Sequence, residues 1–361
     1  METVDVLVVG LGPAGGSAAR CAAARGLRVL GVERNRRIGV PVQCAEFIPA
    51  PMARYASAAG VRVQSITGMK SALPSGARLA TAFPGIMIDR ARFDQSIAQR
   101  AREAGAVLWE ATRLVGLDPT QRLARLQRNG LEVEVRYRLL VAADGPHSTV
   151  GRNLGLPALE VVHTRQYTVP LRGPYADTDI WLSDAYPGGY GWLFPKGAVA
   201  NLGLGADRAL ADADLKTPLD RLHRQLVDTG IVGPMVLQRT GGAIPVGGLR
   251  RRLVEGRVVF VGDAAGLTHP ISGAGIAAAV VSGERAGEAA AACLGADSFG
   301  ALADFEEDVR DQYEGTICRA LERRAFLNRH WHTPAAHDDH VLRRGWIAFD
   351  EYFAEQVAGV T

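Results

Sequence analysis

The sequence predicts an α/β protein with a parallel sheet, and three observations lead to this fold class. Residues 1–33 read as strand, glycine turn, helix and strand in that order. Short apolar runs return at 139–143 and 257–261, each followed by a turn containing glycine. Between 161 and 244, alternating aromatic segments punctuated by Pro and Gly are typical of an antiparallel sheet. We therefore expect a Rossmann-type domain, an inserted antiparallel β-sheet domain and a C-terminal helical segment.

The first strand–turn–helix unit carries a dinucleotide fingerprint, Gly10-Leu11-Gly12-Pro13-Ala14-Gly15. Gly10 permits the tight turn, Gly12 lets the backbone approach a pyrophosphate, and Gly15 lets helix and strand pack closely. The helix that starts at the turn points free N–H groups at the phosphates. Glu33 ends the second strand, where a carboxylate can accept hydrogen bonds from the hydroxyls of an adenosine ribose. These residues predict a dinucleotide site.

Composition narrows the class of protein further. The 361 residues are 47% hydrophobic and 22% charged, which is typical of a globular protein and not of a disordered one. The net charge of +3 and the scattered arginines argue against a nucleic-acid partner. Four widely spaced cysteines with no CxxC motif indicate a reducing compartment, so we expect a cytoplasmic location.

Membrane segments are not expected from the hydropathy pattern. The first strand begins almost at the N-terminus, which leaves no room for a signal peptide. No apolar run reaches about 20 residues, so we expect no spanning segment. Peripheral membrane contact stays open.

The expected domains are discontinuous in sequence. The dinucleotide-binding domain is expected to comprise residues 1–68, 89–155 and 251–295. The substrate-binding β-sheet domain is expected to comprise residues 69–88 and 156–250, and the helical segment residues 296–361. Helices are predicted at 89–105, 215–229 and 273–294, and a hairpin turn at 128–130.

Two further turns make the resemblance to a known class specific. They are Asp144-Gly145 with Ser148 and Arg152, and Gly262-Asp263-Ala264-Ala265. Together with the first turn they resemble the FAD-dependent class that includes the aromatic hydroxylases and the geranylgeranyl reductases. This resemblance implies non-covalently bound FAD, with Asp263 accepting hydroxyls of the ribityl chain. The helix near 273–275 would direct its positive end at the flavin and stabilise the reduced form.

The expected cofactor-binding residues combine the fingerprint with this resemblance. They are Gly10, Gly12, Pro13, Ala14, Gly15, Glu33, Arg34, Cys44, Arg92, Asp144, Gly145, Gly262, Asp263, Gly273, Ala274 and Gly275.

Residues 187–195 indicate which branch of this FAD-dependent class the chain resembles. They reproduce the PxxYxWxFP signature of the geranylgeranyl reductase family, whereas Gly266 and Ile276 stand where aromatic hydroxylases commonly carry His and Asn. Tyr190 and Trp192 alternate on a predicted strand, so both face one side. The resemblance implies that they wall a substrate pocket beside the flavin. The alternative is that they are ordinary aromatic residues of a sheet core.

Cys44 is the third candidate catalytic residue. The similar reductases have a Cys-Gly-Glu-like motif, and this chain has Cys44-Ala45-Glu46, so the cysteine matches and the glycine does not. A thiol with an ordinary pKa of about 8.5 is protonated at neutral pH and can act as an acid. The alternative is a buried structural cysteine.

Histidines suggest no metal site. His330, His332, His337 and His340 fit no common zinc spacing and favour a solvated loop, so we expect no metal. His269 precedes Pro270 at the entrance of the predicted flavin-facing helix. It either faces substrate or flavin, or has a structural role.

Three functions remain open at this level. The first is reduction of C=C bonds in a prenyl substrate by hydride from flavin N5, with Cys44 or Tyr190 protonating the second carbon. The second is a monooxygenase that hydroxylates an aromatic substrate, either a small molecule or a polypeptide side chain, via a C4a-hydroperoxide. The third is a flavoprotein that only relays electrons. Since only one nucleotide fingerprint is present, electrons would come from transient NAD(P)H or from a protein electron donor.

Overall fold

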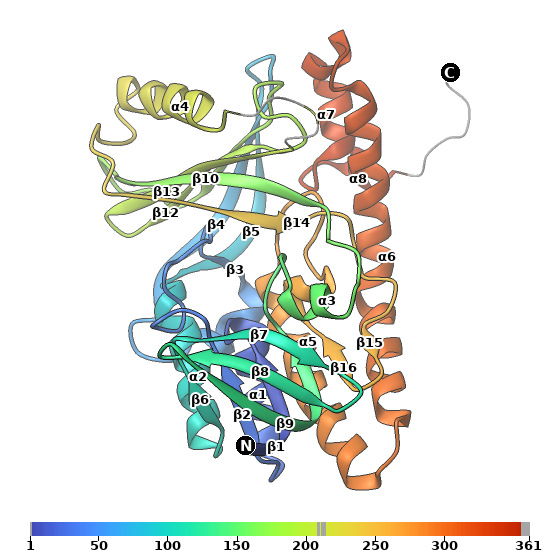
Figure 1. Cartoon of the computed structure of the whole chain (residues 1–361). Helices are drawn as coiled ribbons and strands as arrows, with labels where there is room; N and C mark the ends of the chain where they lie inside the picture. The colour runs from blue at the N-terminus through green and yellow to red at the C-terminus, as the bar shows by residue number, and fades with distance from the viewer. Residues whose placement is uncertain (1, 208–209, 211–213, 355–361) are drawn as a thin grey trace.

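The computed structural model describes residues 2–207, 210 and 214–354. Figure 1 shows two lobes stacked along one long helix, α6 (Gly300–His330). Each lobe is built on an eight-stranded sheet within the described residues. The predicted mixed α/β class, with a Rossmann-type domain and an inserted sheet domain, is confirmed.

The first sheet has the order β15-β16-β9-β1-β2-β6. Its central strands are parallel and nearly completely buried, because helices cover one face and further strands the other. Runs of Val and Leu supply this burial, as the apolar segments of the sequence predicted. The strands are β1 (Glu2–Val9), β2 (Val29–Val32), β6 (Val107–Trp109), β9 (Leu131–Ala142), β15 (Val254–Glu255) and β16 (Val258–Phe260).

Small residues bring the helices of this lobe together. They are α1 (Pro13–Ala23), α2 (Arg90–Glu103) and α5 (Ile276–Ala296). A Cβ on Gly283 of α5 would lie 2.1 Å from the Ala14 carbonyl oxygen, and one on Gly287 would lie 2.6 Å from that of Ala18. Because only glycine permits this approach, α5 lies directly against α1.

An antiparallel extension crosses the other face of the first sheet. Strands β7 (Thr112–Asp118) and β8 (Leu123–Arg128) pair with each other, and β8 pairs with the first half of β9. The predicted hairpin turn is confirmed, with Asn129 at φ 52° and Gly130 at φ 82°. A short helix, α3 (Thr149–Asn153), follows β9.

The second sheet has the order β14-β10-β13-β12-β11-β4-β5-β3. It is antiparallel except for the parallel pair β11–β4, and helix α4 (Lys216–Asp228) packs on it. Its strands are β3 (Phe47–Pro49), β4 (Arg62–Ala72), β5 (Arg78–Ile88), β10 (Val161–Pro170), β11 (Thr178–Trp181), β12 (Gly191–Lys196), β13 (Val199–Ala206) and β14 (Gln238–Pro245).

Strand pairing places some residues in a different sheet from the one expected. The sequence division assigned residues 1–68 to the first lobe, but β3 and residues 62–68 of β4 belong to the second sheet. Strand β4 pairs with β5 along its whole length and passes two register shifts on the way. The register shifts interrupt the alternation of buried side chains, so the hydrophobic pattern does not indicate that the strand begins at Arg62.

The C-terminal helices tie the two lobes together. Helix α6 packs on α5 in the first lobe, and its Arg324 pairs with Asp207 at 2.6 Å and donates to the Gly188 carbonyl at 2.8 Å in the second. Short helices α7 (Asp339–Gly345) and α8 (Asp350–Phe353) follow. Within the described residues, no helix combines the length and apolar character needed to cross a bilayer. The remaining short helices are η1 (Ala50–Ala56), η2 (Gly262–Ala265) and η3 (Pro334–His337).

Candidate active site

The glycine turn between β1 and α1 is built as the fingerprint predicts. Gly10 has φ +92°, and a Cβ there would lie 2.3 Å from the Ala143 carbonyl oxygen. A Cβ on Gly15 would lie 1.8 Å from the Gly10 carbonyl oxygen. At Gly12 a Cβ would meet nothing within 4 Å. The first and last glycines are therefore required by packing. Gly12 faces open space at the start of α1, where Pro13 has no N–H and the N–H groups that follow, from Ala14 on, are available to a phosphate.

Glu33 lies beside this turn at the end of β2. Its carboxylate accepts hydrogen bonds from the backbone N–H of Leu11 at 3.1 Å and of Asn35 at 2.9 Å. The carboxylate thus fixes the glycine turn and retains lone pairs for ribose hydroxyls. Arg34 is exposed next to it.

Asp144 organises the turn that follows β9. It accepts hydrogen bonds from the Ser148 hydroxyl at 2.7 Å and from the N–H groups of Thr149 and Val150 at 2.6 and 2.9 Å. Burial raises the pKa of this carboxyl, although these hydrogen bonds oppose the shift. Asp144 therefore holds the start of α3, and Gly145, at φ +82°, has open space where a Cβ would stand.

Asp263 lies where η2 meets the start of α5. One oxygen accepts from the Thr268 hydroxyl at 2.8 Å, and burial raises the pKa of the carboxyl. A Cβ on Gly275, at the N-cap of α5, would come within 3.2 Å of that oxygen. Gly262 and Gly273 have φ of +55° and +67°, so this turn needs its glycines.

These turns fit a flavin adenine dinucleotide. Gly12 leaves open space where a pyrophosphate must approach. Glu33, after β2, and Asp263, after β16, each present a carboxylate that can accept hydrogen bonds from hydroxyl groups. The N-terminus of α5 adds a positive dipole end beside Asp263. Residues from separated parts of the chain thus form one site at the carboxyl ends of β1, β2 and β16.

Cys44 lies in the loop between β2 and β3, close to this site. Its sulfur accepts a hydrogen bond from the Glu46 N–H at 3.2 Å, and the Gln166 side chain donates to its carbonyl at 3.1 Å. Burial raises the pKa of the thiol, and the Arg90 guanidinium opposes this shift. The thiol is half-buried and held in its protonated form at neutral pH.

Arg90, which was not among the residues predicted from the sequence, lies near both Cys44 and Asp263. Its guanidinium pairs with Asp94 at 2.8 Å and acts electrostatically on both Cys44 and Asp263. The side chain of Arg92 is 61% exposed and lies over Gly60. The signal in the sequence was the i, i+4 spacing of Arg90 and Asp94 at the first turn of a helix, on its buried side.

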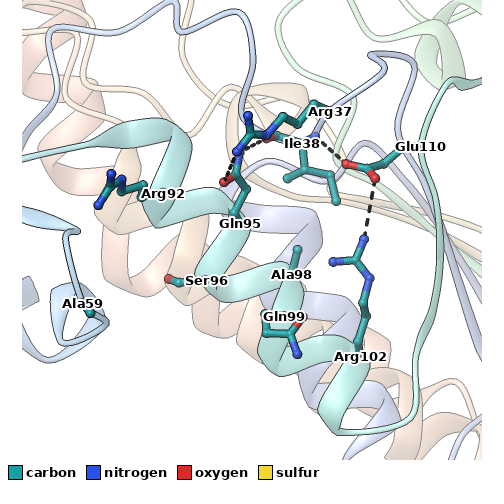
Figure 2. Close-up of a pocket in the computed structure, with 10 residues that line it drawn as sticks. All are labelled: Arg37, Ile38, Ala59, Arg92, Gln95, Ser96, Ala98, Gln99, Arg102 and Glu110. Atoms are coloured by element: carbon teal, nitrogen blue, oxygen red, sulfur yellow. Dashed lines mark hydrogen bonds and ion pairs between the residues drawn. The ribbon is translucent and has the colours of Figure 1, made fainter.

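Figure 2 shows Arg92 on the outer face of α2, at one end of a surface cavity of about 470 Å³. Arg37 and Arg102 also line this cavity, and they contact Gln95 and Glu110. The structure therefore does not bring Arg92 together with Cys44 and Asp263.

Tyr190 and Trp192 meet as an aromatic pair with ring centroids 5.7 Å apart. The Tyr190 hydroxyl donates to the Ser272 carbonyl at 2.5 Å, which places this residue against the turn before α5. The Trp192 indole N–H donates to Gln166 at 3.1 Å, and Gln166 also binds Cys44. Tyr190 precedes β12 instead of lying within it, but both rings face the same side, as expected.

The C-terminal segment completes this aromatic cluster. Trp346 lies 4.8 Å from Tyr190 between ring centroids, and its indole N–H donates to the Ser71 hydroxyl at 3.1 Å. Trp331 and Phe349 belong to the same buried cluster. No motif in residues 296–361 had indicated this role, since the aromatics there are irregularly spaced.

His269 has a structural role. Its Nδ1 accepts from the N–H groups of Ile271 and Ser272 at 3.3 and 3.2 Å, and its Nε2 lies 3.3 Å from the Tyr352 hydroxyl. Burial lowers the pKa of His269 to about 4, so the ring is neutral. It holds residues 269–275, including Ala274, whose carbonyl accepts from the His269 N–H at 3.0 Å.

The histidines near the C-terminus do not converge. His330 contacts the Phe326 carbonyl at 2.8 Å, and His337 lies 3.5 Å from Asp184. In the part of the chain that the structure describes, no three His, Cys, Asp or Glu side chains are grouped as metal ligands.

Comparison with known proteins gives the family. No family model matches the chain. It is 31% identical over 341 residues to the digeranylgeranylglycerophospholipid reductase of Thermoplasma volcanium, covering 87% of this chain and 85% of the relative. It is 36% identical over 344 residues to digeranylgeranylglycerophospholipid reductase 1 of Methanopyrus kandleri, covering 86% and 88%.

Comparison with solved structures leads to the same family. A geranylgeranyl bacteriochlorophyll reductase-like protein from Thermoplasma acidophilum has a TM-score of 0.85 at 29% identity, covering 97% of this chain and 93% of that one. Aklavinone-11 hydroxylase, solved with FAD and aklavinone, has a TM-score of 0.71 at 22% identity, covering 94% and 71%, and shares the fold. The chain belongs to the geranylgeranyl reductase family of FAD-dependent oxidoreductases, together with the digeranylgeranylglycerophospholipid reductases.

Proposed function

We propose that this protein reduces isolated C=C bonds in the prenyl chain of a lipid. The observation that carries the proposal is that Cys44, whose thiol is protonated, lies beside the Tyr190–Trp192 pair: Gln166 donates to the Cys44 carbonyl and accepts from the Trp192 indole N–H. Tyr190 also touches the turn before α5, beside Asp263. The relatives named as reductases of digeranylgeranylglycerophospholipid support the substrate class.

The cofactor would be held by backbone more than by side chains. The open space at Gly12 and the N–H groups at the start of α1 would receive the pyrophosphate, and Glu33 would receive the ribose. Asp263 and the N-terminus of α5 hold the other end. The chemistry that FAD would supply when bound there in its reduced form is hydride transfer.

An isolated alkene accepts a hydride poorly, so a proton must be delivered to the second carbon. Cys44 is the better donor of the two candidates, because its thiol is protonated and half-buried in the site. Burial raises the pKa of both groups, but a phenol has a higher ordinary pKa than a thiol, and the Tyr190 hydroxyl already donates its hydrogen to the Ser272 carbonyl. We assign Tyr190 and Trp192 to the pocket wall.

The aromatic cluster supplies a dry surface for an apolar chain. Trp192 and Trp346 are 6% and 3% exposed, and both indole N–H groups are hydrogen-bonded within the protein. Such a wall binds prenyl carbons and excludes water from the reacting centre. Electrons would come from transient NAD(P)H or from a protein donor.

Anaerobic reduction of the purified protein, followed by mixing with a prenyl lipid, tests this function. We expect faster reoxidation of the flavin absorbance than with buffer alone, and a lipid product that has gained two hydrogens. If the flavin reoxidises only with oxygen, and an added aromatic compound is recovered with a new hydroxyl group, the protein is a monooxygenase instead.

A further inference from the structure

The segment 42–46, which carries Cys44, lies across the second sheet and is bound to its strands one after another. The Val42 carbonyl accepts from the Thr240 hydroxyl at 2.8 Å, and the Gln43 side chain donates to the Gly241 carbonyl at 2.7 Å, both on β14. The next two contacts are made by side-chain amides: Gln166 of β10 donates to the Cys44 carbonyl, and Asn201 of β13 donates to the Ala45 carbonyl at 3.2 Å.

The order of these contacts matches the order of the strands. β14, β10, β13 and β12 are neighbours in the sheet, and the segment crosses them in that sequence, residue by residue. The thiol of Cys44 is thus placed by the sheet that also carries Trp192, although Cys44 lies in a loop that follows the first lobe's β2.

Glu46 anchors the far end of the segment. Its carboxylate accepts from Lys196 Nζ of β12 at 2.8 and 2.7 Å and from Asn201 Nδ2 at 2.9 Å. It also accepts from the backbone N–H of Arg90, the first residue of α2, at 2.9 Å. The Glu46 side chain is 5% exposed and that of Lys196 is 20% exposed, so this is a largely buried, fully hydrogen-bonded ion pair.

The backbone of Glu46 is in the left-handed region, with φ +71°. A glutamate adopts this conformation only where the surroundings impose it, and such residues gather at functional sites. The same turn directs the Glu46 N–H at the Cys44 sulfur, at 3.2 Å. The ion pair that holds Glu46 in place therefore also holds the hydrogen bond to the thiol.

We propose that Glu46 and Lys196 are a positioning pair for Cys44, which fixes the thiol over the sheet that carries Trp192 and balances the charge around it. This proposal rests on the proposed role of Cys44 as proton donor. Lys196 directly follows the PxxYxWxFP signature, so one strand holds both the aromatic wall and the clamp for the thiol.

The charges that act on the thiol come from α2 and from the segment itself. They are Arg90 and Glu46, and each has a partner of opposite charge: Asp94 pairs with Arg90, and Lys196 of β12 pairs with Glu46. Removing the Glu46 charge leaves Arg90 and Lys196 to favour the thiolate, whereas removing the Lys196 charge leaves Glu46 to oppose it. The two variants should therefore shift the thiol titration in opposite directions, which loss of structure alone would not do.

The test is the pH dependence of iodoacetamide alkylation of Cys44 in FAD-loaded protein whose Cys21, Cys293 and Cys318 are replaced by Ala. We expect E46Q to shift the titration to lower pH and K196M to higher pH, by about one pH unit each, which is tenfold in the thiolate fraction. The double variant E46Q/K196M should return toward the parent. K70M is the matched control, because Lys70 pairs with Asp177 on the same sheet but is 40% exposed.

Identical titrations in the parent, E46Q and K196M would overturn the proposal, as would shifts in the same direction. We further expect kcat for alkene reduction to fall at least tenfold in both single variants, with KM changed less. If the parent protein reduces no prenyl lipid while the opposite titration shifts appear, the proposed function fails and the positioning pair stands.

Discussion

The glycine turn at Gly10–Gly15 and the site around Cys44 are formed in opposite ways. The turn is local: its glycines contact each other and the neighbouring strand end at Ala143, and its function lies in its backbone. The Cys44 site gathers single side chains from the loop after β2, from β10 and β12, and from the C-terminal Trp346. A backbone site is specified by a short motif, whereas a side-chain site depends on the packing of the whole molecule.

The two regions should also fail differently. Changes at Gly10 and Gly15 should act on folding and cofactor retention together, because these glycines are packed against backbone, whereas a change at Gly12 should act on cofactor retention alone. Changes in the Cys44 site should separate catalysis from stability, since several independent contacts hold that segment.

The largest effect is expected at Cys44. Cys44→Ala should lower the rate of alkene reduction by about 10²–10⁴-fold, the usual contribution of a positioned proton donor. FAD content and unfolding temperature should stay near the parent values, because the segment is held through backbone carbonyls. Cys318→Ala, at an exposed cysteine, is the control. Full activity of Cys44→Ala in a steady-state assay would show that the proton comes from elsewhere.

Two glycine variants test whether Gly15 and Gly12 have separate roles in the turn. Gly15→Ala places a methyl group 1.8 Å from the Gly10 carbonyl oxygen and should cost about 3 kcal/mol or more of unfolding free energy. Gly12→Ala meets no protein atom within 4 Å and should fold normally but retain less FAD. Thermal unfolding and flavin absorbance separate the two effects. Equal stability of both variants would contradict the packing role of Gly15.

His269 makes the turn before α5 sensitive to acid. Its pKa in the folded protein, about 4, lies below the ordinary value of 6.5, so the unfolded state binds the proton more tightly. Its contribution to stability is therefore complete above pH 6.5 and is lost as the pH falls toward 4, by about 3 kcal/mol. Urea unfolding across this range should show a steeper loss for the parent than for His269→Gln. Parallel curves would mean that the ring is not buried in its neutral form.

The smallest effect is expected where the C-terminal segment joins the aromatic cluster. Ser71→Ala leaves the buried Trp346 indole N–H without its acceptor and should cost about 1–2 kcal/mol of unfolding free energy. Ser57→Ala, at an exposed serine, is the matched control. Chemical denaturation measures both. An unchanged midpoint for Ser71→Ala would indicate that Trp346 packs without this hydrogen bond.

The errors of the sequence analysis lie where local pattern and tertiary contact disagree. Arg92 and Arg90 stand two residues apart on one helix, and composition cannot tell which faces Cys44. The sheet boundary near Arg62 was displaced because β4 contains register shifts that interrupt the alternation of buried residues.

The sequence by itself determined the fold class, the three glycine turns and the aromatic signature at 187–195. Each is a local property, because a backbone turn or a strand period depends on neighbouring residues. Only the tertiary structure decided that Asp144 holds α3, that Arg90 faces Cys44, and that Glu46 pairs with Lys196. Such contacts join residues far apart in the chain, and no short-range pattern specifies which side chains meet once the two sheets and α6 have packed.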